Sequence, residues 1–263
     1  MKKLLLCPPT HYDIRYEINP WMSKENPIDH DKVSEEYRTL TYAYRQLGIS
    51  YDELDPSPEL PDQVYTTDLG HAEGNLFIKA NFKYPERQKE ALLAEEYFKT
   101  NGFDVSTLPE GVYFEGGDLL KVGDVYYFGF GKRSSKEAVE PIQEALGKPV
   151  IPIELPDEYF YHLDTCFSPL SEDVALINRE ALTPEGIAEI ENYFKSVIDV
   201  RGDDNKLLAC NLISHEGTVI MSQGVSNELK DQIIAHGFRV ATVPIGEYLK
   251  GGGGIHCVSL EII

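Results

Sequence analysis

Basic residues are scarce in this chain of 263 residues, because 24 lysines and arginines stand against 44 aspartates and glutamates, for a net charge of −20. Nucleic acids and anionic membranes carry charge of the same sign, so the composition argues against either as a partner. An acidic surface would instead favour the approach of a small cation. A more ordinary interpretation is that acidic side chains keep the protein in solution, and charge alone does not choose between the two.

Cysteine is also scarce, with Cys7, Cys166, Cys210 and Cys257 at wide, irregular spacings. The sequence has no Cys-x-x-Cys pair that would indicate zinc or a redox disulfide, and too few cysteines for a disulfide framework. The apolar run at 4–7 is too short for a signal peptide, and no stretch approaches the length of a membrane span. We therefore expect a cytoplasmic protein.

Helical patterns recur along the chain, which at 42% apolar residues has the composition of a folded protein. In the first of them, apolar residues from Val33 to Leu47 follow one another at spacings of 4, 3, 4 and 3. Ser134 and Glu137 have the spacing of a capping box, and Thr183-Pro184 is a typical helix start. We expect helices at 32–47, 87–101, 134–146, 183–200 and 226–236. Glycine follows four of these helices, at positions 48, 102, 147 and 237.

Short strand-like runs lie between these helices. They are 49–54, 64–67, 75–79, 103–105, 112–115, 125–130, 150–153, 161–167, 174–178, 207–211, 219–222, 238–243 and 255–263, after a first strand at 4–7. Five units of similar size, each with one helix and several strands, predict a repeated α/β architecture arranged in a ring. The alternative is a doubly wound α/β sheet, but the additional hairpin-like strands argue against it. No linker composition interrupts the chain, so we expect one domain over 1–263.

Cys257 follows the four consecutive glycines 251–254 after two intervening residues. A lone cysteine is most often a small buried core residue. A core strand gains nothing from four glycines, however, whereas glycine lets the backbone approach a ligand or a neighbouring segment closely. This favours Cys257 as a nucleophile that a small substrate can reach. Cys7, Cys166 and Cys210 are expected to be structural.

Two further segments carry residues suited to acid–base chemistry. His162 and Asp164 would share one face of a strand, although such a pair is equally typical of a solvated strand edge. Glu115 precedes Gly116, Gly117 and Asp118, a combination that is also ordinary turn chemistry. Each segment is ambiguous by itself, and their combination with Cys257 is what indicates a thiol enzyme.

Together, Phe114-Glu115-Gly116-Gly117-Asp118, His162-Leu163-Asp164-Thr165 and the glycine-rich segment before Cys257 resemble the motifs of the guanidino-group modifying superfamily. Its members include arginine deiminases, dimethylarginine dimethylaminohydrolases and amidinotransferases. The resemblance implies the pentein fold, a five-bladed pseudo-symmetric α/β propeller, in agreement with the five units. Nearly the whole chain is most similar to the short arginine dihydrolase and deiminase-like branch.

The resemblance also implies roles for individual residues. Cys257 would attack the guanidinium carbon, His162 would act as general acid and base, and Glu115 would hold His162 or a substrate nitrogen. Asp68 and Asp164 would bind the guanidinium group. The other candidate substrate contacts are Arg87 and Arg133, for the α-carboxylate, together with Asn19, Asp62 and Asp118. No metal and no organic cofactor is expected, because thiol and imidazole suffice for this hydrolysis.

The substrate and the reaction remain open between related alternatives. Two aspartates, Asp68 and Asp164, suit an unsubstituted guanidinium with all its N–H donors, so free arginine is favoured over dimethylarginine. In the dihydrolases that the chain resembles, asparagine stands where Asp68 stands here, and it is tied to a second round of hydrolysis that yields ornithine. We therefore favour a deiminase that forms citrulline and ammonia. An amidinotransferase and a non-catalytic pentein binding protein are further alternatives. The sequence leaves the oligomeric state open, and a homo-oligomer is compatible with it.

Overall fold

The computed structural model describes residues 3–263 as a mixed α/β structure with one six-stranded and three three-stranded sheets. The strands are β1 (Lys3–Leu6), β2 (Ser50–Glu53), β3 (Gly70–Glu73), β4 (Leu76–Lys79), β5 (Asp104–Ser106), β6 (Leu119–Val122), β7 (Val125–Phe130), β8 (Val150–Glu154), β9 (Phe167–Pro169), β10 (Val174–Ile177), β11 (Ser196–Asp199), β12 (Ile213–His215), β13 (Thr218–Ser222), β14 (Arg239–Val243) and β15 (Leu260–Ile262). The α-helices are α1 (His30–Gln46), α2 (Gln88–Thr100), α3 (Val139–Leu146), α4 (Pro184–Tyr193), α5 (Asp203–Lys206), α6 (Asn227–Ala235) and α7 (Gly246–Leu249).

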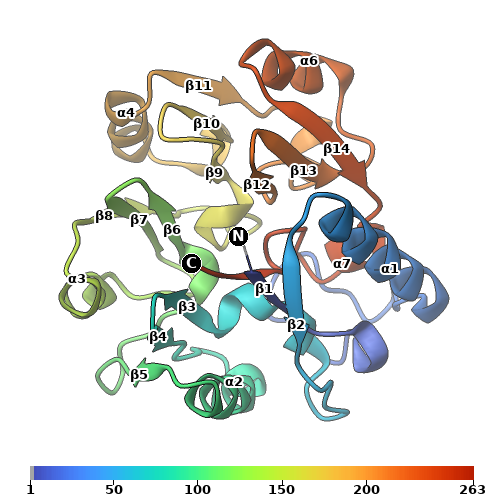
Figure 1. Ribbon diagram of the computed structural model, residues 1–263, viewed down its shortest axis with the longest axis vertical. Helices are drawn as coiled ribbons and strands as arrows, with labels where there is room; N and C mark the ends of the chain where they lie inside the picture. Colours follow the sequence, from blue (N-terminus) through green and yellow to red (C-terminus); the bar gives the residue numbers. More distant parts are fainter. Residues whose placement is uncertain (1–2) are drawn as a thin grey trace.

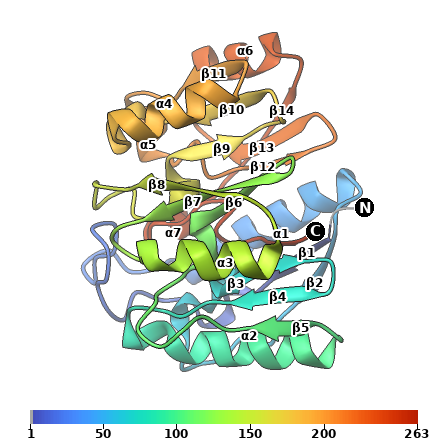
Figure 2. The same cartoon turned by 90° about the vertical axis from the view of Figure 1, so that its left-hand side faces the viewer.

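One three-stranded unit occurs five times. In each unit the first two strands are antiparallel, a helix follows the second strand, and the third strand runs parallel to the second. The units are β15-β1-β2, β3-β4-β5, β6-β7-β8, β9-β10-β11 and β12-β13-β14, with helices α1, α2, α3, α4 and α6 respectively. These helices lie on the outside of the molecule, around the strands (Figures 1 and 2). The antiparallel pair in every unit rules out the all-parallel, doubly wound alternative.

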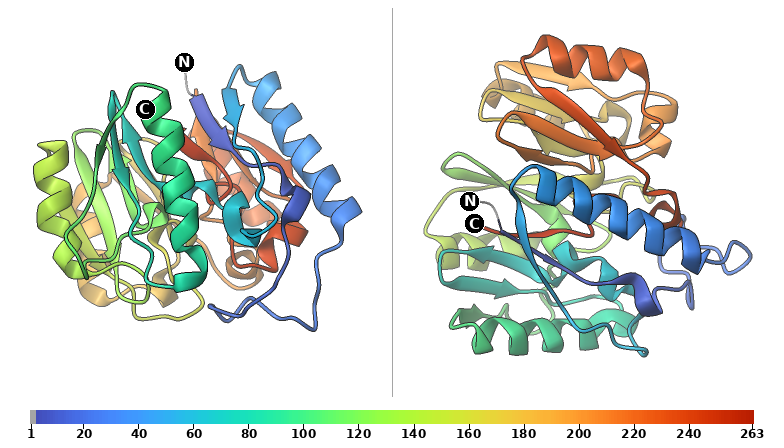
Figure 3. Two further views of the ribbon diagram at one scale, coloured as in Figure 1. Left: turned by 90° about the horizontal axis from the view of Figure 1, so that it is seen from below. Right: turned by 45° about the vertical axis from the view of Figure 1, so that its right-hand side comes forward.

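The first unit takes one of its three strands, β15, from the far end of the described chain. β15 pairs with β1 in antiparallel register, with Lys3 opposite Ile262, so the first and last strands run side by side (Figure 3). β15 also meets β3 through the single pair Ile262–Ala72, which joins two units into the six-stranded sheet. The sheets do not close into a ring through strand pairing, so a closed propeller stays a prediction.

The helix ends follow the expected chemistry at most positions. Thr183 and Ser226 accept hydrogen bonds from the first-turn N–H groups of α4 and α6. The glycines at 48, 102, 147 and 237 all have positive φ, as glycines that end helices commonly do. The expected helix at 183–200 is too long. α4 ends at Tyr193, and the last part of the expected range forms β11.

The predicted capping box at Ser134 and Glu137 is wrong. α3 begins only at Val139, and Ser134 serves a different purpose. Its hydroxyl donates to Asp118 Oδ2 at 2.6 Å and accepts from the backbone N–H of Glu115 at 3.0 Å. A serine three residues before a glutamate is therefore used here to join two segments, not to start a helix.

Several expected strands are turns instead. Segments 64–67 and 161–167 contain 3₁₀ turns, at Thr66–Leu69 and Leu163–Thr165, and 207–211 is a loop. Segment 112–115 contributes one isolated bridge, Asn81–Phe114, and only the end of 255–263 is a strand. Apolar runs in these segments are buried without being part of a sheet, and hydrophobic pattern alone does not separate the two cases.

These turns occupy equivalent places in the five units, each just before the first strand. They contain Asp68 before β3, Asp118 before β6, Asp164 before β9, Asn211 before β12 and Cys257 before β15. Neighbouring turns contact one another in order around the centre. The contacts are Thr67 N to Cys257 O at 3.0 Å, the close approach of Gly116 to Thr67, Leu163 N to Asp118 Oδ1 at 3.0 Å, Asn211 Nδ2 to Asp164 O at 3.2 Å, and Cys257 N to Asn211 Oδ1 at 3.0 Å.

The apolar core consists of five clusters, and each cluster is shared by two neighbouring units. In the second unit, for example, Phe77 of β4 stacks on Phe98 of α2 with ring centroids 3.8 Å apart. The packed units leave the polar turns free to meet in the middle. Within residues 3–263, none of the helices is both long enough and apolar enough to cross a membrane.

The close approach at Gly116 generates a prediction about stability. A Cβ at this position would lie 2.1 Å from Thr67 O and 2.2 Å from Gly70 O. We expect Gly116→Ala to lower the free energy of unfolding by about 2 kcal/mol or more, because backbone would have to move. Urea denaturation measures this loss. The matched control is Gly246→Ala, where the nearest atom is 3.5 Å away. Equal losses in the two variants would contradict the packing argument.

Candidate active site

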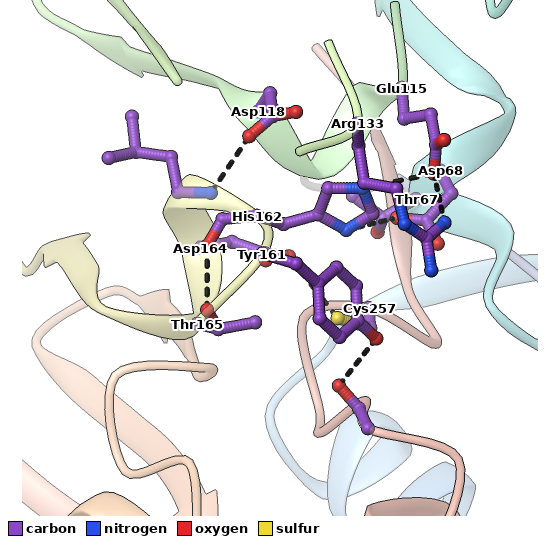
Figure 4. Close-up of polar contacts among 12 residues, drawn as sticks. Thr67, Asp68, Glu115, Asp118, Arg133, Tyr161, His162, Asp164, Thr165 and Cys257 are labelled. Atoms are coloured by element: carbon purple, nitrogen blue, oxygen red, sulfur yellow. Dashed lines mark hydrogen bonds and ion pairs between the residues drawn. The ribbon is translucent and has the colours of Figure 1, made fainter. Parts of the chain in front are cut away.

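The polar residues of the central turns form one cluster around Cys257 (Figure 4). Cys257 itself is only 1% exposed. Its Sγ accepts a hydrogen bond from Asn211 Nδ2 at 3.0 Å and lies 3.4 Å from Asp164 Oδ2. Burial raises the pKa of Cys257 well above its ordinary value, and the Asp164 and Asp68 carboxylates raise it further. The thiol therefore holds its proton at neutral pH until a cation arrives beside it.

Each of the four glycines before Cys257 allows a close contact. A Cβ on Gly251 would lie 2.2 Å from the hydroxyl of Tyr65, and one on Gly253 would lie 2.3 Å from the same ring. Gly252 has φ +89° and approaches the hydroxyl of Tyr161, which donates to its carbonyl at 2.8 Å. At Gly254, a Cβ would lie 2.9 Å from Asn211 Oδ1. The glycine run thus packs the chain tightly enough to place the thiol at the centre.

His162 is fully buried between two carboxylates. Its Nε2 lies 3.0 Å from Glu115 Oε2 and its Nδ1 lies 3.4 Å from Asp68 Oδ1. Burial alone would lower the pKa of His162, but Asp68, Asp118 and Glu115 outweigh it and raise the pKa to about 9. The imidazole is therefore a cation at neutral pH and can donate a proton. The expected strand around His162 is absent, so the residue reaches the cluster from the turn before β9.

Glu115 is ionised because cations surround it. Arg133 Nη1 donates to Glu115 Oε2 at 2.9 Å. Burial would raise the pKa of Glu115, but Arg133 and then His162 lower it to about 2. The guanidinium of Arg133 lies over the rings of Tyr84 and Tyr161, at 4.8 and 4.6 Å from their centroids.

Arg87 is held by acidic residues on two sides. It donates to Asp68 Oδ2 at 2.6 Å and to Glu90 Oε2 at 2.8 Å, and all three side chains are buried. Asp62, 1% exposed, accepts from Arg87 through its backbone carbonyl at 3.3 Å. Arg87 thus fixes Asp68, and the structure brings it close to the cluster without leaving its guanidinium open to a ligand.

Asp164 links the thiol to His256. One carboxylate oxygen, Oδ2, lies 2.8 Å from His256 Nδ1 and 3.4 Å from Cys257 Sγ. Its other oxygen, Oδ1, is buried without a hydrogen-bond partner among the described residues. His256, together with Thr67 and Gly116, also lines a cavity of about 300 Å³.

Asp118 and Asn19 lie at the edges of the cluster. Asp118 accepts from Leu163 N at 3.0 Å and from Ser134 Oγ at 2.6 Å, so both of its oxygens are engaged in holding the His162 segment. In the view of Figure 4 it lies on the side of His162 away from Cys257. Asn19 donates to Gly251 O at 2.9 Å. With Arg133 and Tyr161, Asn19 lines a cavity of about 320 Å³ that leads toward the cluster.

A metal ion is a poor fit to these residues. Among residues 3–263, ligand atoms of Asp68, Glu115 and His162 lie within 4.8 Å of one another. Both carboxylates are already paired with arginine, however, at 2.6 Å from Arg87 and 2.9 Å from Arg133. A metal would have to compete with two guanidinium groups, and the arrangement suits proton transfer better. The absence of a metal and of a cofactor stays a prediction.

Sequence reasoning missed Asn211 and His256. Asn211 fell in a run interpreted as a strand, and His256 was overlooked beside Cys257. The repeat could have indicated Asn211, because it precedes the first strand of its unit as Asp68, Asp118 and Asp164 precede theirs. Chemically, the cluster offers a nucleophilic sulfur, a protonated imidazole and unpaired carboxylate oxygens within one buried site.

Known proteins match this chain along nearly all of its length. The N,N-dimethylarginine dimethylaminohydrolase of Mycobacterium tuberculosis is 31% identical over 99% of this chain and 86% of its own. The bifunctional arginine dihydrolase/ornithine cyclodeaminase ArgZ of Synechocystis is 33% identical over 99% of this chain, which spans only 37% of ArgZ. A crystal structure of the ArgZ N-terminal domain bound to product superposes with a TM-score of 0.95, at 34% identity, covering 100% of this chain and 97% of that domain.

The family model described as N,N dimethylarginine dimethylhydrolase, eukaryotic, matches residues 13–263. This match and the relatives above confirm the resemblance that the Cys257, His162 and Glu115 segments indicated. The chain therefore belongs to the dimethylarginine dimethylhydrolase family of guanidino-modifying proteins.

Proposed function

We propose that this protein hydrolyses the guanidinium group of free arginine to citrulline and ammonia, through a covalent intermediate on Cys257. The observation that carries the proposal is a set of buried carboxylate oxygens that lack hydrogen-bond partners among residues 3–263. They are Asp62 Oδ2, Glu115 Oε1, Asp164 Oδ1 and Asp68 Oδ1, the last of which has only the ion pair with His162 Nδ1 at 3.4 Å. Buried acceptors of this kind need donors, and a guanidinium supplies five N–H groups in one plane with a positive charge.

Binding would also prepare the nucleophile. A guanidinium held by Asp68 and Asp164 brings a positive charge next to the sulfur of Cys257, which lies 3.4 Å from Asp164. The cation favours the thiolate over the thiol and offsets the carboxylates that otherwise oppose ionisation. Substrate binding and activation of the thiol are then one event.

The chemical steps balance with these residues alone. The thiolate forms a C–S bond to the guanidinium carbon, and protonated His162 gives its proton to the departing nitrogen, which leaves as ammonia. Neutral His162 then takes a proton from water as the water oxygen attacks the thiouronium carbon. The C–S bond breaks and the remaining hydroxyl proton passes to the released ammonia or to solvent, so that neutral citrulline leaves and thiolate and imidazolium are restored.

Arg133 and Asn19 are the residues we assign to the amino-acid end of the substrate. Both line the cavity of about 320 Å³, together with Tyr161. Arg87 is paired with Asp68 and Glu90, so we assign the α-carboxylate to Arg133 and regard Arg87 as the support of Asp68.

Dimethylarginine is the second candidate substrate, because the chain covers 86% of the M. tuberculosis dimethylaminohydrolase but only 37% of ArgZ. Methylation removes two N–H donors, which would leave an aspartate oxygen of the site without its partner. The two aspartates therefore favour arginine.

We further infer that the five units are the blades of a pentein propeller and that 1–263 acts as one catalytic domain. Support comes from the repeated strand order and from the succession of contacts between the central turns. The match to the isolated ArgZ N-terminal domain, over 97% of its length, supports the same inference.

Product analysis with L-arginine tests the proposed function. We expect one citrulline and one ammonia per turnover, and no product from Cys257→Ser, since a hydroxyl is a far weaker nucleophile here. Chromatography resolves citrulline from ornithine, and dimethylarginine is assayed in parallel for dimethylamine. Ornithine with two ammonia would move the protein to the dihydrolase reaction, and turnover of dimethylarginine alone would change the substrate.

Asp68 generates a prediction about the product. We expect Asp68→Asn to slow the first hydrolysis and to raise the ratio of ornithine to citrulline, because a neutral amide suits the uncharged ureido group of citrulline better than a carboxylate does. The ratio is measured after complete consumption of arginine. A variant that is slower but still forms citrulline alone would show that position 68 does not choose the product.

The raised pKa of His162 predicts the alkaline limit of activity. The imidazolium must protonate the leaving nitrogen, so kcat should fall as pH rises through about 9. In Glu115→Gln an anion that favours the imidazolium is removed, so the pKa of His162 falls and the alkaline limb moves to lower pH. A pH profile of kcat for both proteins measures this shift. An unmoved limb in a folded Glu115→Gln variant would show that another group controls it.

A further inference from the structure

Both polar atoms of the Asn211 side-chain amide form hydrogen bonds with Cys257. Its Oδ1 accepts from the backbone N–H of Cys257 at 3.0 Å, and its Nδ2 donates to Sγ at 3.0 Å. Nδ2 also donates to the backbone carbonyl of Asp164 at 3.2 Å. Because Oδ1 faces an N–H donor and Nδ2 a carbonyl, the contacts fix which way the amide points. The N–H aimed at the sulfur is therefore imposed by the surroundings.

The backbone around Asn211 is arranged for this contact. Asn211 is fully buried in the loop after α5, where Leu208 has φ +47°, an uncommon conformation for leucine. The backbone N–H of Asn211 donates to the carbonyl of Leu208 at 2.8 Å. On the other side, Gly254 leaves room for the amide, since a Cβ there would lie 2.9 Å from Oδ1. The uncommon backbone conformation at Leu208 and the absence of a side chain at Gly254 both serve the contact of Asn211 with Cys257. Backbone strain of this kind is typical of functional positions.

The chemistry of the site calls for a neutral donor at this sulfur. Asp164 and Asp68 both oppose a negative charge on Cys257. A lysine or arginine would stabilise the thiolate but would repel a guanidinium substrate. An amide N–H stabilises the anion and adds no charge.

We propose that Asn211 is a further catalytic residue, which stabilises the thiolate of Cys257 through its Nδ2–H. The proposal rests on the assignment of Cys257 as nucleophile in the proposed function. In the reaction, the sulfur is anionic before it attacks and again when the C–S bond breaks. The Nδ2–H donor therefore stabilises the sulfur before the attack and again when the product is released. Its hydrogen bond is weaker while the sulfur is bonded to carbon, because the sulfur is then uncharged.

Alkylation of Cys257 by iodoacetamide tests the proposal without any substrate. The rate constant is measured from pH 6 to 9, and the modified peptide is identified by mass because the chain has four cysteines. We expect Asn211→Ala to react about tenfold more slowly than the unaltered protein at a given pH, as the loss of one hydrogen bond to a charged group implies. Asn211→Asp, which keeps the shape but replaces the donor and adds an anion, should react more slowly still.

Asn205→Ala is the matched control. Asn205 is buried in the same segment, at α5, and its Nδ2 donates to Asn178 Oδ1 at 3.2 Å instead of to the thiol. We expect it to alkylate Cys257 at the unaltered rate. Thermal unfolding of every variant verifies that the comparison is between folded proteins.

The outcomes are distinct from those of the product test. Unchanged alkylation in folded Asn211→Ala and Asn211→Asp would overturn the proposal, and so would an equal loss in Asn205→Ala. Slower alkylation of the Asn211 variants in a protein that leaves arginine intact would sustain the role of Asn211 while refuting arginine as the substrate.

Discussion

The site depends on one constraint, which is that it contains more buried carboxylates than cations to pair with them. Glu115 is matched by Arg133 and His162, and Asp68 is matched in part by Arg87. One oxygen of each of these residues, and one of Asp164, nevertheless lacks a hydrogen-bond partner in the part of the chain that is described. Ionised groups in a protein interior are costly unless paired, so the fold must hold these residues in place against their mutual repulsion. In the proposed function, the same imbalance makes the site selective, because a cation with several donors would complete it.

The fold offsets this cost by separating the apolar packing of the outer helices from the polar residues of the central turns. Each outer helix belongs to an apolar cluster that two neighbouring units share, as α2 does with β4 and β1. The turns before the first strand of each unit are then free to carry polar residues inward. Contacts between consecutive turns hold these residues in a fixed geometry.

Sequence patterns were sufficient for the elements whose chemistry is local. Helix starts at Thr183 and Ser226 and the glycines after four helices depend on neighbouring residues only, and Cys257, His162 and Glu115 were indicated by their motifs. The failures involve contacts between distant segments. Ser134 has the spacing of a cap but bonds to Asp118, and 207–211 has the composition of a strand but bends to bring Asn211 to Cys257. A local sequence pattern does not indicate which distant residue a side chain contacts, and Cys257 is 46 residues from Asn211.

The pairing of β1 with β15 determines when the first unit can be completed during synthesis. Lys3 pairs with Ile262 of β15, and Cys257 lies just ahead of that strand. During synthesis the first unit has an open edge until almost the whole described chain has left the ribosome, and contacts of such long sequence separation form slowly. The last strand thus brings the sulfur to the centre as it closes the first unit. A chain synthesised only as far as β14 has the acids and the histidine but lacks the sulfur of Cys257 between them.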